Sequence, residues 1–78
     1  MKVTVKVPKL GLTTEQVTFS EWSKTLGTQV AQGEVIAVLE ADKATVDVEA
    51  PIAGRLAAFL VEPGAELAIG DPLAVLEA

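Results

Sequence analysis

The sequence predicts an all-β domain, a small sandwich or flattened barrel whose two packed sheets are related by an approximate two-fold axis. Three observations predict it. Short runs of alternating apolar and polar residues recur along the chain, glycine and proline separate these runs, and the second half of the chain repeats the first. Alternation with a period of two is typical of half-buried strands, and about eight short strands with tight turns indicate a sandwich or barrel.

The internal repeat is the strongest of these observations. A shift of 37 residues places residues 21–41 on residues 58–78, and eight of the 21 positions are then identical. The run AVLEA at 37–41 recurs unchanged at 74–78. A shift of 43 places residues 3–8 on 46–51, so the first half carries six extra residues within 9–17. The chain therefore reads as one domain built from two similar halves, with one loop longer in the first.

The expected strands follow from the repeat. Residues 3–7 alternate valine with threonine and lysine, and residues 46–50 repeat this pattern. Residues 37–41 and 74–78 form the ends of the two halves. No helix is expected, because no ten-residue segment keeps a helical period without glycine or proline. The expected core is Val5, Val7, Val17, Trp22, Val30, Ile36, Val38, Val48, Ile52, Leu56, Phe59, Leu67, Leu73 and Val75.

Composition excludes several classes of protein. With 78 residues the chain is long enough for one domain, and it has neither cysteine nor histidine, which excludes disulfides, thiol or imidazole catalysis and the usual zinc ligands. A net charge of −5 argues against nucleic-acid and membrane partners, and no apolar run approaches a membrane span. Carboxylates such as Asp47 and Glu49 alternate on an exposed strand face, so we expect no metal site and no catalytic activity of the domain itself.

The segment EADKATVDVEAP, residues 40–51, contains a hairpin turn without glycine, asparagine or proline. Lys43 stands at its tip, at the junction of the two halves. The place equivalent to this turn in the second half is occupied by the two chain ends. A two-fold arrangement therefore predicts that the turn and the termini lie at opposite ends of the domain. Taken alone, an exposed lysine in an acidic turn is an ordinary solvated charge, since a type I turn accepts most residues.

Several motifs at matching spacing resemble one family over essentially the whole chain. They are PKLG at 8–11, EW at 21–22, Gly27, Val30, Gly33, the hairpin at 40–51, Gly54 and the closing segment at 62–77. Together they resemble the lipoyl domain of the acyltransferase (E2) components of 2-oxo acid dehydrogenase complexes. The resemblance implies a barrel-sandwich hybrid of two four-stranded antiparallel sheets with quasi-two-fold symmetry.

The resemblance also implies a site and a function. Lys43 would carry lipoic acid in amide linkage, with Asp42 and Ala44 as the flanking positions that an attaching enzyme reads. The lipoyl group would be reductively acylated by a thiamin-dependent dehydrogenase (E1), would deliver the acyl group to the E2 catalytic domain for transfer to coenzyme A, and would be reoxidised by dihydrolipoyl dehydrogenase (E3). Glu40 and the longer loop of the first half, here called the surplus loop, are expected to contact these partners. The residues of this loop are Leu10, Gly11, Leu12, Thr13, Thr14, Glu15 and Gln16.

Other readings of the same residues stay open. Biotinyl domains of carboxylases share the fold but typically place the modified lysine between two methionines, whereas Asp42 and Ala44 flank Lys43 here. Membrane-fusion adaptor proteins use similar halves as unmodified structural modules, and the surplus loop could be an inert insertion. We expect a monomeric domain excised from a longer acyltransferase of the bacterial cytoplasm or mitochondrial matrix. The sequence names neither the 2-oxo acid nor the number of such domains in the parent chain.

Overall fold

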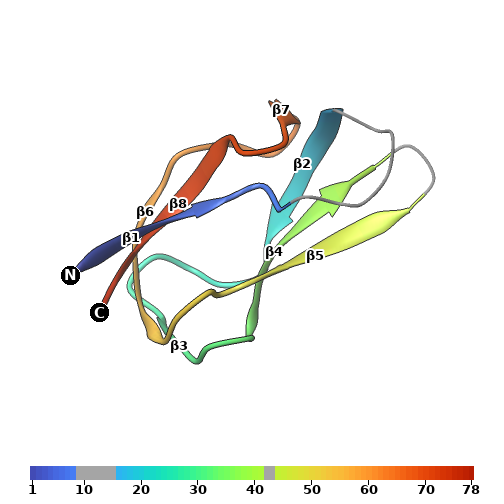
Figure 1. The fold of residues 1–78 in the computed structure, drawn as a ribbon. Helices are drawn as coiled ribbons and strands as arrows, with labels where there is room; N and C mark the ends of the chain where they lie inside the picture. The colour runs from blue at the N-terminus through green and yellow to red at the C-terminus, as the bar shows by residue number, and fades with distance from the viewer. Residues whose placement is uncertain (9–15, 42–43) are drawn as a thin grey trace.

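The structure is a computed structural model that describes residues 1–8, 16–41 and 44–78. All regular structure within these residues is β-strand (Figure 1). No helix in them is long and apolar enough to cross a membrane. The strands are β1 (Lys2–Lys6), β2 (Gln16–Trp22), β3 (Gln29–Val30), β4 (Val35–Glu40), β5 (Thr45–Glu49), β6 (Gly54–Phe59), β7 (Glu66–Ala68) and β8 (Pro72–Glu77).

The strands form two four-stranded sheets in which neighbouring strands are antiparallel. One sheet has the order β1-β8-β6-β3 and the other has the order β5-β4-β2-β7. The two sheets face each other across the apolar core, and the molecule measures 33 × 21 × 17 Å along its principal axes. This architecture confirms the predicted all-β fold of two packed four-stranded sheets.

The repeat in the sequence exchanges the two sheets. A shift of 43 residues carries β1 onto β5, and a shift of 37 carries β4 onto β8, with identical bounds in both cases. Under the same shifts the order β1-β8-β6-β3 becomes β5-β4-β2-β7. The turns repeat as well, because Gly33 and its mate Gly70 have φ angles of 85° and 91°, a left-handed conformation that glycine adopts without steric cost. The quasi-two-fold symmetry is therefore a property of the backbone.

Hydrogen bonds outside the strand ladders obey the same symmetry. The N–H of Gly33 donates to the carbonyl of Ala50 at 2.9 Å, and the mate bond runs from Gly70 to Val7 at 3.1 Å. Every backbone bond of this kind in the described residues has such a counterpart. Side-chain hydrogen bonds follow the same symmetry. The carboxylate of Glu34 accepts from the N–H of Ala31, and the carboxylate of Asp71 accepts from the N–H of Ala68. These paired bonds satisfy turn groups that would otherwise lack partners.

Most of the predicted core is confirmed. Nine predicted residues are buried, and Trp22, Ile52 and Phe59 are partly buried and pack against them. The buried residues that the sequence analysis did not name are Phe19, Ala37, Leu39, Ala50, Ala74 and Leu76.

Two predicted core positions were wrong. Val38 and Val75 are only partly buried, and Leu39 and Leu76 lie fully inside instead. The cause is a pair of symmetry-related bulges. The β4–β5 register passes from Val35 opposite Glu49 directly to Ala37 opposite Val48, which leaves Ile36 as the extra residue. An extra residue shifts the alternation between the two faces by one position, so that consecutive residues are buried.

Candidate functional site

The candidate site is the turn between β4 and β5. These strands pair up to Glu40 opposite Thr45, and beyond that pair the N–H of Ala41 donates to the carbonyl of Ala44 over 2.8 Å. The two residues between these flanks, Asp42 and Lys43, lie outside the described residues. Their predicted roles in attachment therefore stay predictions, while the strand ends that hold them are defined.

Residues on both sides of this turn are exposed, Ala41 is partly buried against the core, and fully buried residues of the same strands lie behind them. Glu40, Ala44 and Thr45 are exposed to solvent. Leu39 and Val48, on the same two strands, are fully buried in the core. Alternation along each strand thus turns one set of side chains inward and leaves the other set, including Glu40 and Thr45, in solvent. Such an arrangement presents a group to solvent instead of enclosing it.

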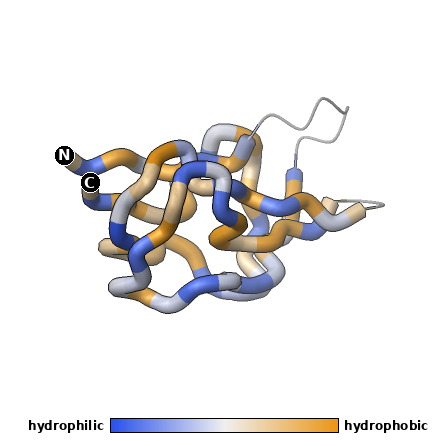
Figure 2. The backbone as a smooth tube through the Cα atoms, turned by 90° about the horizontal axis from the view of Figure 1, so that it is seen from below, coloured by the Kyte–Doolittle hydropathy of each residue, from blue (hydrophilic) through white to orange (hydrophobic). Residues whose placement is uncertain are grey.

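The termini lie at the other end of the molecule. The N–H of Ala78 donates to the carbonyl of Met1 over 2.9 Å, so the two chain ends are adjacent. Figure 1 places both ends at the left and the ends of β4 and β5 at the right, and Figure 2 shows the same separation from below. For the flanks Ala41 and Ala44 this agrees with the arrangement expected from the repeat.

The predicted partner loop is described only at its last residue. Leu10, Gly11, Leu12, Thr13, Thr14 and Glu15 lie outside the described residues. Gln16 begins β2, where it pairs with Ala68 of β7. Because Thr18 pairs with Glu40, Gln16 stands two residues beyond the last β2–β4 pair, on the side of the turn. The structure therefore brings Gln16 and Glu40 to the same end of one sheet.

Thr18 is a neighbour of the turn that the sequence analysis did not identify. It pairs with Glu40 of β4 on one side and with Glu66 of β7 on the other. Nothing within residues 16–22 signals this neighbour. Register between strands that are distant in the sequence is set by how whole faces pack and not by a local motif.

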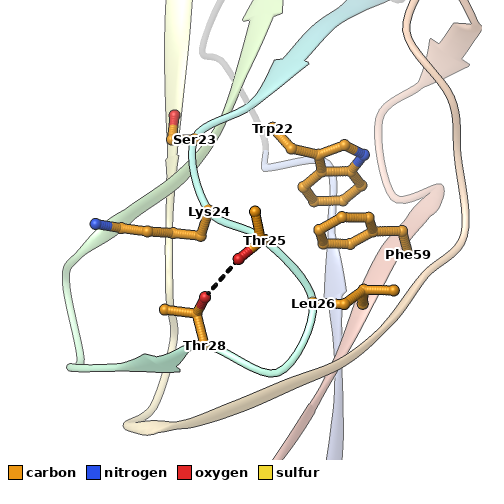
Figure 3. A pocket seen from close by; sticks show the side chains of 7 residues that line it. All are labelled: Trp22, Ser23, Lys24, Thr25, Leu26, Thr28 and Phe59. Carbon is orange, nitrogen blue, oxygen red and sulfur yellow. Dashed lines mark hydrogen bonds between the residues drawn. The ribbon is translucent and has the colours of Figure 1, made fainter.

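Away from the turn, a shallow groove runs beside a stacked aromatic pair (Figure 3). The rings of Trp22 and Phe59 stack with centroids 3.8 Å apart and planes 6° from parallel. Leu26 lines the same groove and is 54% exposed, and the hydroxyls of Thr25 and Thr28 are hydrogen-bonded at 3.0 Å. The groove is thus mainly apolar with a hydroxyl-bearing edge.

Ionic contacts in the described residues lie at the surface. The ammonium of Lys24 contacts the carboxylate of Glu34 at 2.7 Å. This hydrogen bond, together with the one from the N–H of Ala31, holds the pKa of Glu34 below its ordinary value. The described residues include no buried polar or charged side chain and no group of acidic residues able to hold a metal ion.

Comparison with known proteins assigns the family. The family model described as "Biotin-requiring enzyme" (biotin/lipoyl) matches residues 3–76, nearly the whole chain. The chain belongs to this family of biotin- and lipoyl-carrying domains.

Two curated relatives show where such domains occur. The chain is 42% identical over 77 residues to the pyruvate dehydrogenase E1 component subunit beta of Rhizobium meliloti, covering 97% of this chain. It is 37% identical over 73 residues to the lipoamide acyltransferase component of the branched-chain alpha-keto acid dehydrogenase complex of Pseudomonas aeruginosa, covering 94% of this chain. The chain spans only 17% of the length of each of these relatives.

Two solved structures share the fold. The lipoyl domain of the 2-oxoglutarate dehydrogenase complex from Azotobacter vinelandii matches with a TM-score of 0.77 at 26% identity, covering 97% of this chain and 96% of that one. A single-chain, multi-domain long-chain acyl-CoA carboxylase matches with a TM-score of 0.78 at 30% identity, covering 95% of this chain and 7% of that one. Both confirm the fold.

Proposed function

We propose that the chain is a swinging-arm carrier domain that bears lipoic acid in amide linkage to Lys43 and serves a 2-oxo acid dehydrogenase complex. The observation that carries this proposal is the β4–β5 turn. Glu40, Ala44 and Thr45 beside it are exposed, the bond from Ala41 to Ala44 closes its base, and these strand ends lie at the end of the domain opposite the termini. A turn at this end of the domain would point away from the rest of a longer chain. A carrier domain needs this arrangement so that its attached group can reach the partner enzymes.

The protein's part in this function is to present Lys43 for attachment and to position the attached lipoyl group near its partner enzymes. The amine of a lysine side chain is chemically suited to an amide linkage with a carboxylic acid, and Lys43 stands between strand ends whose residues Glu40, Ala44 and Thr45 are exposed. The lipoyl group would supply a disulfide that accepts an acyl group on reduction and is regenerated by thiol–disulfide exchange. Because the domain tethers this group, each encounter with an active site of the complex becomes intramolecular, which raises its effective concentration.

Two sets of residues are proposed to guide the partners. Asp42 and Ala44 would be read, with Glu40, by the enzyme that attaches the group. The segment 10–16 would contact E1. The place of Gln16 at the same end of the sheet as Glu40 supports this, because one surface of E1 would then contact both the segment and the β4–β5 turn. The E2 catalytic domain and E3 would meet the group at the same turn. The compartments expected from the sequence, bacterial cytoplasm or mitochondrial matrix, stay predictions.

We propose that the parent chain is a dihydrolipoamide acyltransferase, in which this segment would act as a carrier and the reaction would take place elsewhere. The similarity to the acyltransferase of Pseudomonas aeruginosa supports this parent. The similarity to an E1 beta subunit supports a second parent for the same carrier, a chain of the decarboxylating component. In both cases the domain would serve the same type of complex.

A biotin carrier is the second candidate, and the likeness to the acyl-CoA carboxylase favours it. The residues that separate the two are the flanks of Lys43. Aspartate and alanine stand there, whereas the biotinyl pattern has methionine on both sides. The sequence flanks therefore favour lipoate over biotin.

The carrier function is tested by reductive acylation. The lipoylated chain is incubated with thiamin diphosphate, a 2-oxo acid and the matching E1, in separate reactions for pyruvate, 2-oxoglutarate and a branched-chain acid, and its intact mass is followed. One E1 should add one acyl group per chain. The lipoyl domain from Azotobacter vinelandii serves as a positive control with the 2-oxoglutarate enzyme. Failure with every E1, while each acylates its own lipoyl domain, would contradict the carrier function.

A further inference from the structure

Two shallow grooves meet at the stacked pair of Trp22 and Phe59, and both rings line both grooves. The first is the groove of Figure 3, and the second is lined by Trp22, residues 59–63 and Ala65. A shift of 37 residues carries the lining of the first groove onto that of the second, with the two aromatic residues exchanging places. The grooves are therefore the two halves of one surface about the quasi-two-fold axis, here called the aromatic face.

The aromatic face exposes adjoining apolar side chains. Of the four large apolar side chains that are exposed in the described residues, two lie here, Leu26 at 54% and Leu60 at 48%. Figure 3 shows Leu26 next to the Phe59 ring on the side away from Trp22, and its repeat mate Pro63 is exposed as well. Single exposed apolar residues are ordinary, but several that adjoin one another mark an interaction surface.

The same face offers hydrogen-bond donors. None of the side-chain hydrogen bonds found in the described residues involves the indole N–H of Trp22, and no buried side-chain nitrogen in them lacks a partner, so this N–H reaches the surface. The hydroxyls of Thr25 and Thr28 bond to each other, which leaves the hydrogen of one of them free to donate. A ligand of this face therefore needs apolar groups together with acceptors.

The charge of the face is negative. Lys24 lines the first groove, but its ammonium contacts Glu34 at 2.7 Å, and Figure 3 shows its side chain directed away from the aromatic pair. Glu62 lines the second groove, is exposed, and takes part in none of the ion pairs found in the described residues. A complementary partner therefore carries a cation beside its apolar groups.

These requirements select among the possible occupants. A second copy of the chain would bring the same carboxylate and a net charge of −5, so like charges would oppose its binding. A helix is unsuited, because its carbonyls are already bonded within it. A proline-rich segment matches, because the polyproline II conformation leaves its carbonyls free to accept, its rings are apolar, and proline has no N–H that would need an acceptor.

We infer that the aromatic face docks a proline-rich extended segment of a partner protein, with the rings of Trp22 and Phe59 against its prolines, the indole N–H on one of its carbonyls, and a lysine or arginine of the segment at Glu62. This goes beyond the proposed function, since Lys43 takes no part in it. Trp22 lies four residues along β2 from Thr18, which pairs with Glu40 beside the candidate turn. Four strand residues span about 13 Å, so a docked segment leaves the turn free.

The test is an NMR titration of the isotope-labelled chain with the acetylated and amidated peptide PPLPPKLPP. Trp22 is the only tryptophan of the chain, so its indole N–H resonance is identified without ambiguity. We expect this resonance to move downfield as the hydrogen bond forms and to saturate with peptide. Backbone amide resonances give the dissociation constant of each variant. A glycine-serine peptide of the same length with one lysine should cause no saturable shift.

Variants of the face should weaken binding. Leu26→Ser and Trp22→Phe, which keeps a ring but loses the N–H, should each raise the dissociation constant by at least about threefold, through loss of apolar contact or of one hydrogen bond. Ile69→Ser is the matched control, since Ile69 is exposed and lines neither groove, and it should keep the native value. A peptide with glutamate in place of lysine should bind the native chain at least about twofold more weakly, and this difference should disappear in Glu62→Gln.

The outcomes that would overturn the inference are distinct from those that concern the carrier. No saturable shift in the folded native chain, or equal dissociation constants for Leu26→Ser and Ile69→Ser, would show that the face does not dock such a segment. Resonances of the face that move with the concentration of the chain alone would assign it to a second copy instead. Modification of Lys43 is measured separately, so a failure of docking leaves the proposed function standing.

Discussion

Trp22 and Phe59, which occupy equivalent positions in the two halves of the sequence, stack directly on each other with ring centroids 3.8 Å apart. Two residues related by a two-fold axis can touch only where they lie close to that axis. The aromatic pair therefore marks the point at which the quasi-two-fold axis passes between the halves. Phe19 extends the cluster, with its ring centroid 4.6 Å from that of Trp22. This cluster ties one half of the domain to the other.

Truncating this pair should weaken the whole fold. For Phe59→Ala we expect a loss of about 2–3 kcal/mol in the free energy of unfolding, below the range for a fully buried phenylalanine because the ring is partly exposed. Leu60→Ala, at a neighbouring side chain that is 48% exposed, should change stability by less than about 0.5 kcal/mol. Chemical denaturation measures both. In a double-mutant cycle with Trp22→Ala, coupling of about 0.5–1.5 kcal/mol is expected, and strict additivity would contradict the stacking account.

Gly54 should tolerate no side chain, because β8 passes too close to it. A Cβ at this position would lie 2.9 Å from the carbonyl oxygen of Glu77, a backbone atom that cannot move aside freely. Gly54→Ala should therefore cost about 1–3 kcal/mol and disturb the pairing of β6 with β8.

Gly27 is the matched control for Gly54, since its cost has a different origin. It has a φ of +85°, and no atom lies within 4 Å of the place that a Cβ would take. Gly27→Ala should therefore cost about 1–2 kcal/mol through backbone strain alone. Asparagine tolerates the left-handed conformation and should recover part of the loss at Gly27 but none at Gly54. Equal recovery at both positions, measured by thermal unfolding, would argue against the steric explanation.

Acid should remove a contribution that Glu34 makes to stability. Its pKa is lowered in the folded state, first by the hydrogen bond with Lys24 and then by that from the N–H of Ala31. A lowered carboxyl pKa stabilises the fold above the pKa of the unfolded chain, near 4.5, and this stabilisation disappears as the pH falls through the lower folded value. Melting temperatures measured from pH 7 to pH 3 should therefore fall less steeply for Glu34→Gln than for the native chain.

Glu66 provides the control for this pH dependence. Its exposed side chain makes none of the hydrogen bonds or ion pairs found in the described residues. Glu66→Gln removes the same charge without removing such a contact, and this variant and the native chain together give the reference slope of melting temperature against pH. A native slope in Glu34→Gln as well would show that the Lys24–Glu34 contact does not contribute in solution.

Much of the fold could be predicted from the sequence because the repeat doubles each weak local signal. Gly33 and Gly70 recur with the apolar positions around them, and each turn in one half supports the assignment of its mate. The errors at Val38 and Val75 arose where alternation fails. A bulge depends on the pairing of two strands, so the extra residue at Ile36 has no local sequence signal.

The candidate site, like the fold, could be predicted from the sequence only in part. The exposure of Glu40 and Ala44 and their place opposite the termini follow from the repeat alone. The neighbour Thr18 could not be predicted, because it depends on the register between β2 and β4. The choice of lipoate over biotin rests on the residue types beside Lys43, since the fold is common to both kinds of carrier.

The segment 10–16 should govern recognition by E1 and leave attachment unaffected. Replacing residues 10–16 by a shorter linker, such as two glycines, should lower the rate of reductive acylation by at least about tenfold while lipoylation of Lys43 proceeds normally. The control replaces Gln32-Gly33, an exposed turn at the opposite end of β4 from the candidate turn, by Asn-Gly, and should retain both rates. Full reductive acylation of the shortened chain would show that the segment is an inert insertion.

The most direct test of the central claim is the intact mass of the chain after incubation with lipoate, ATP and a lipoate–protein ligase. Parallel reactions use Lys43→Gln and a biotin ligase with biotin. We predict one lipoyl group on the native chain, none on Lys43→Gln, and no biotin on either. Addition of biotin alone would make the domain a carboxylase carrier. A native chain that neither ligase modifies would contradict the account and leave Lys43 an ordinary solvated residue.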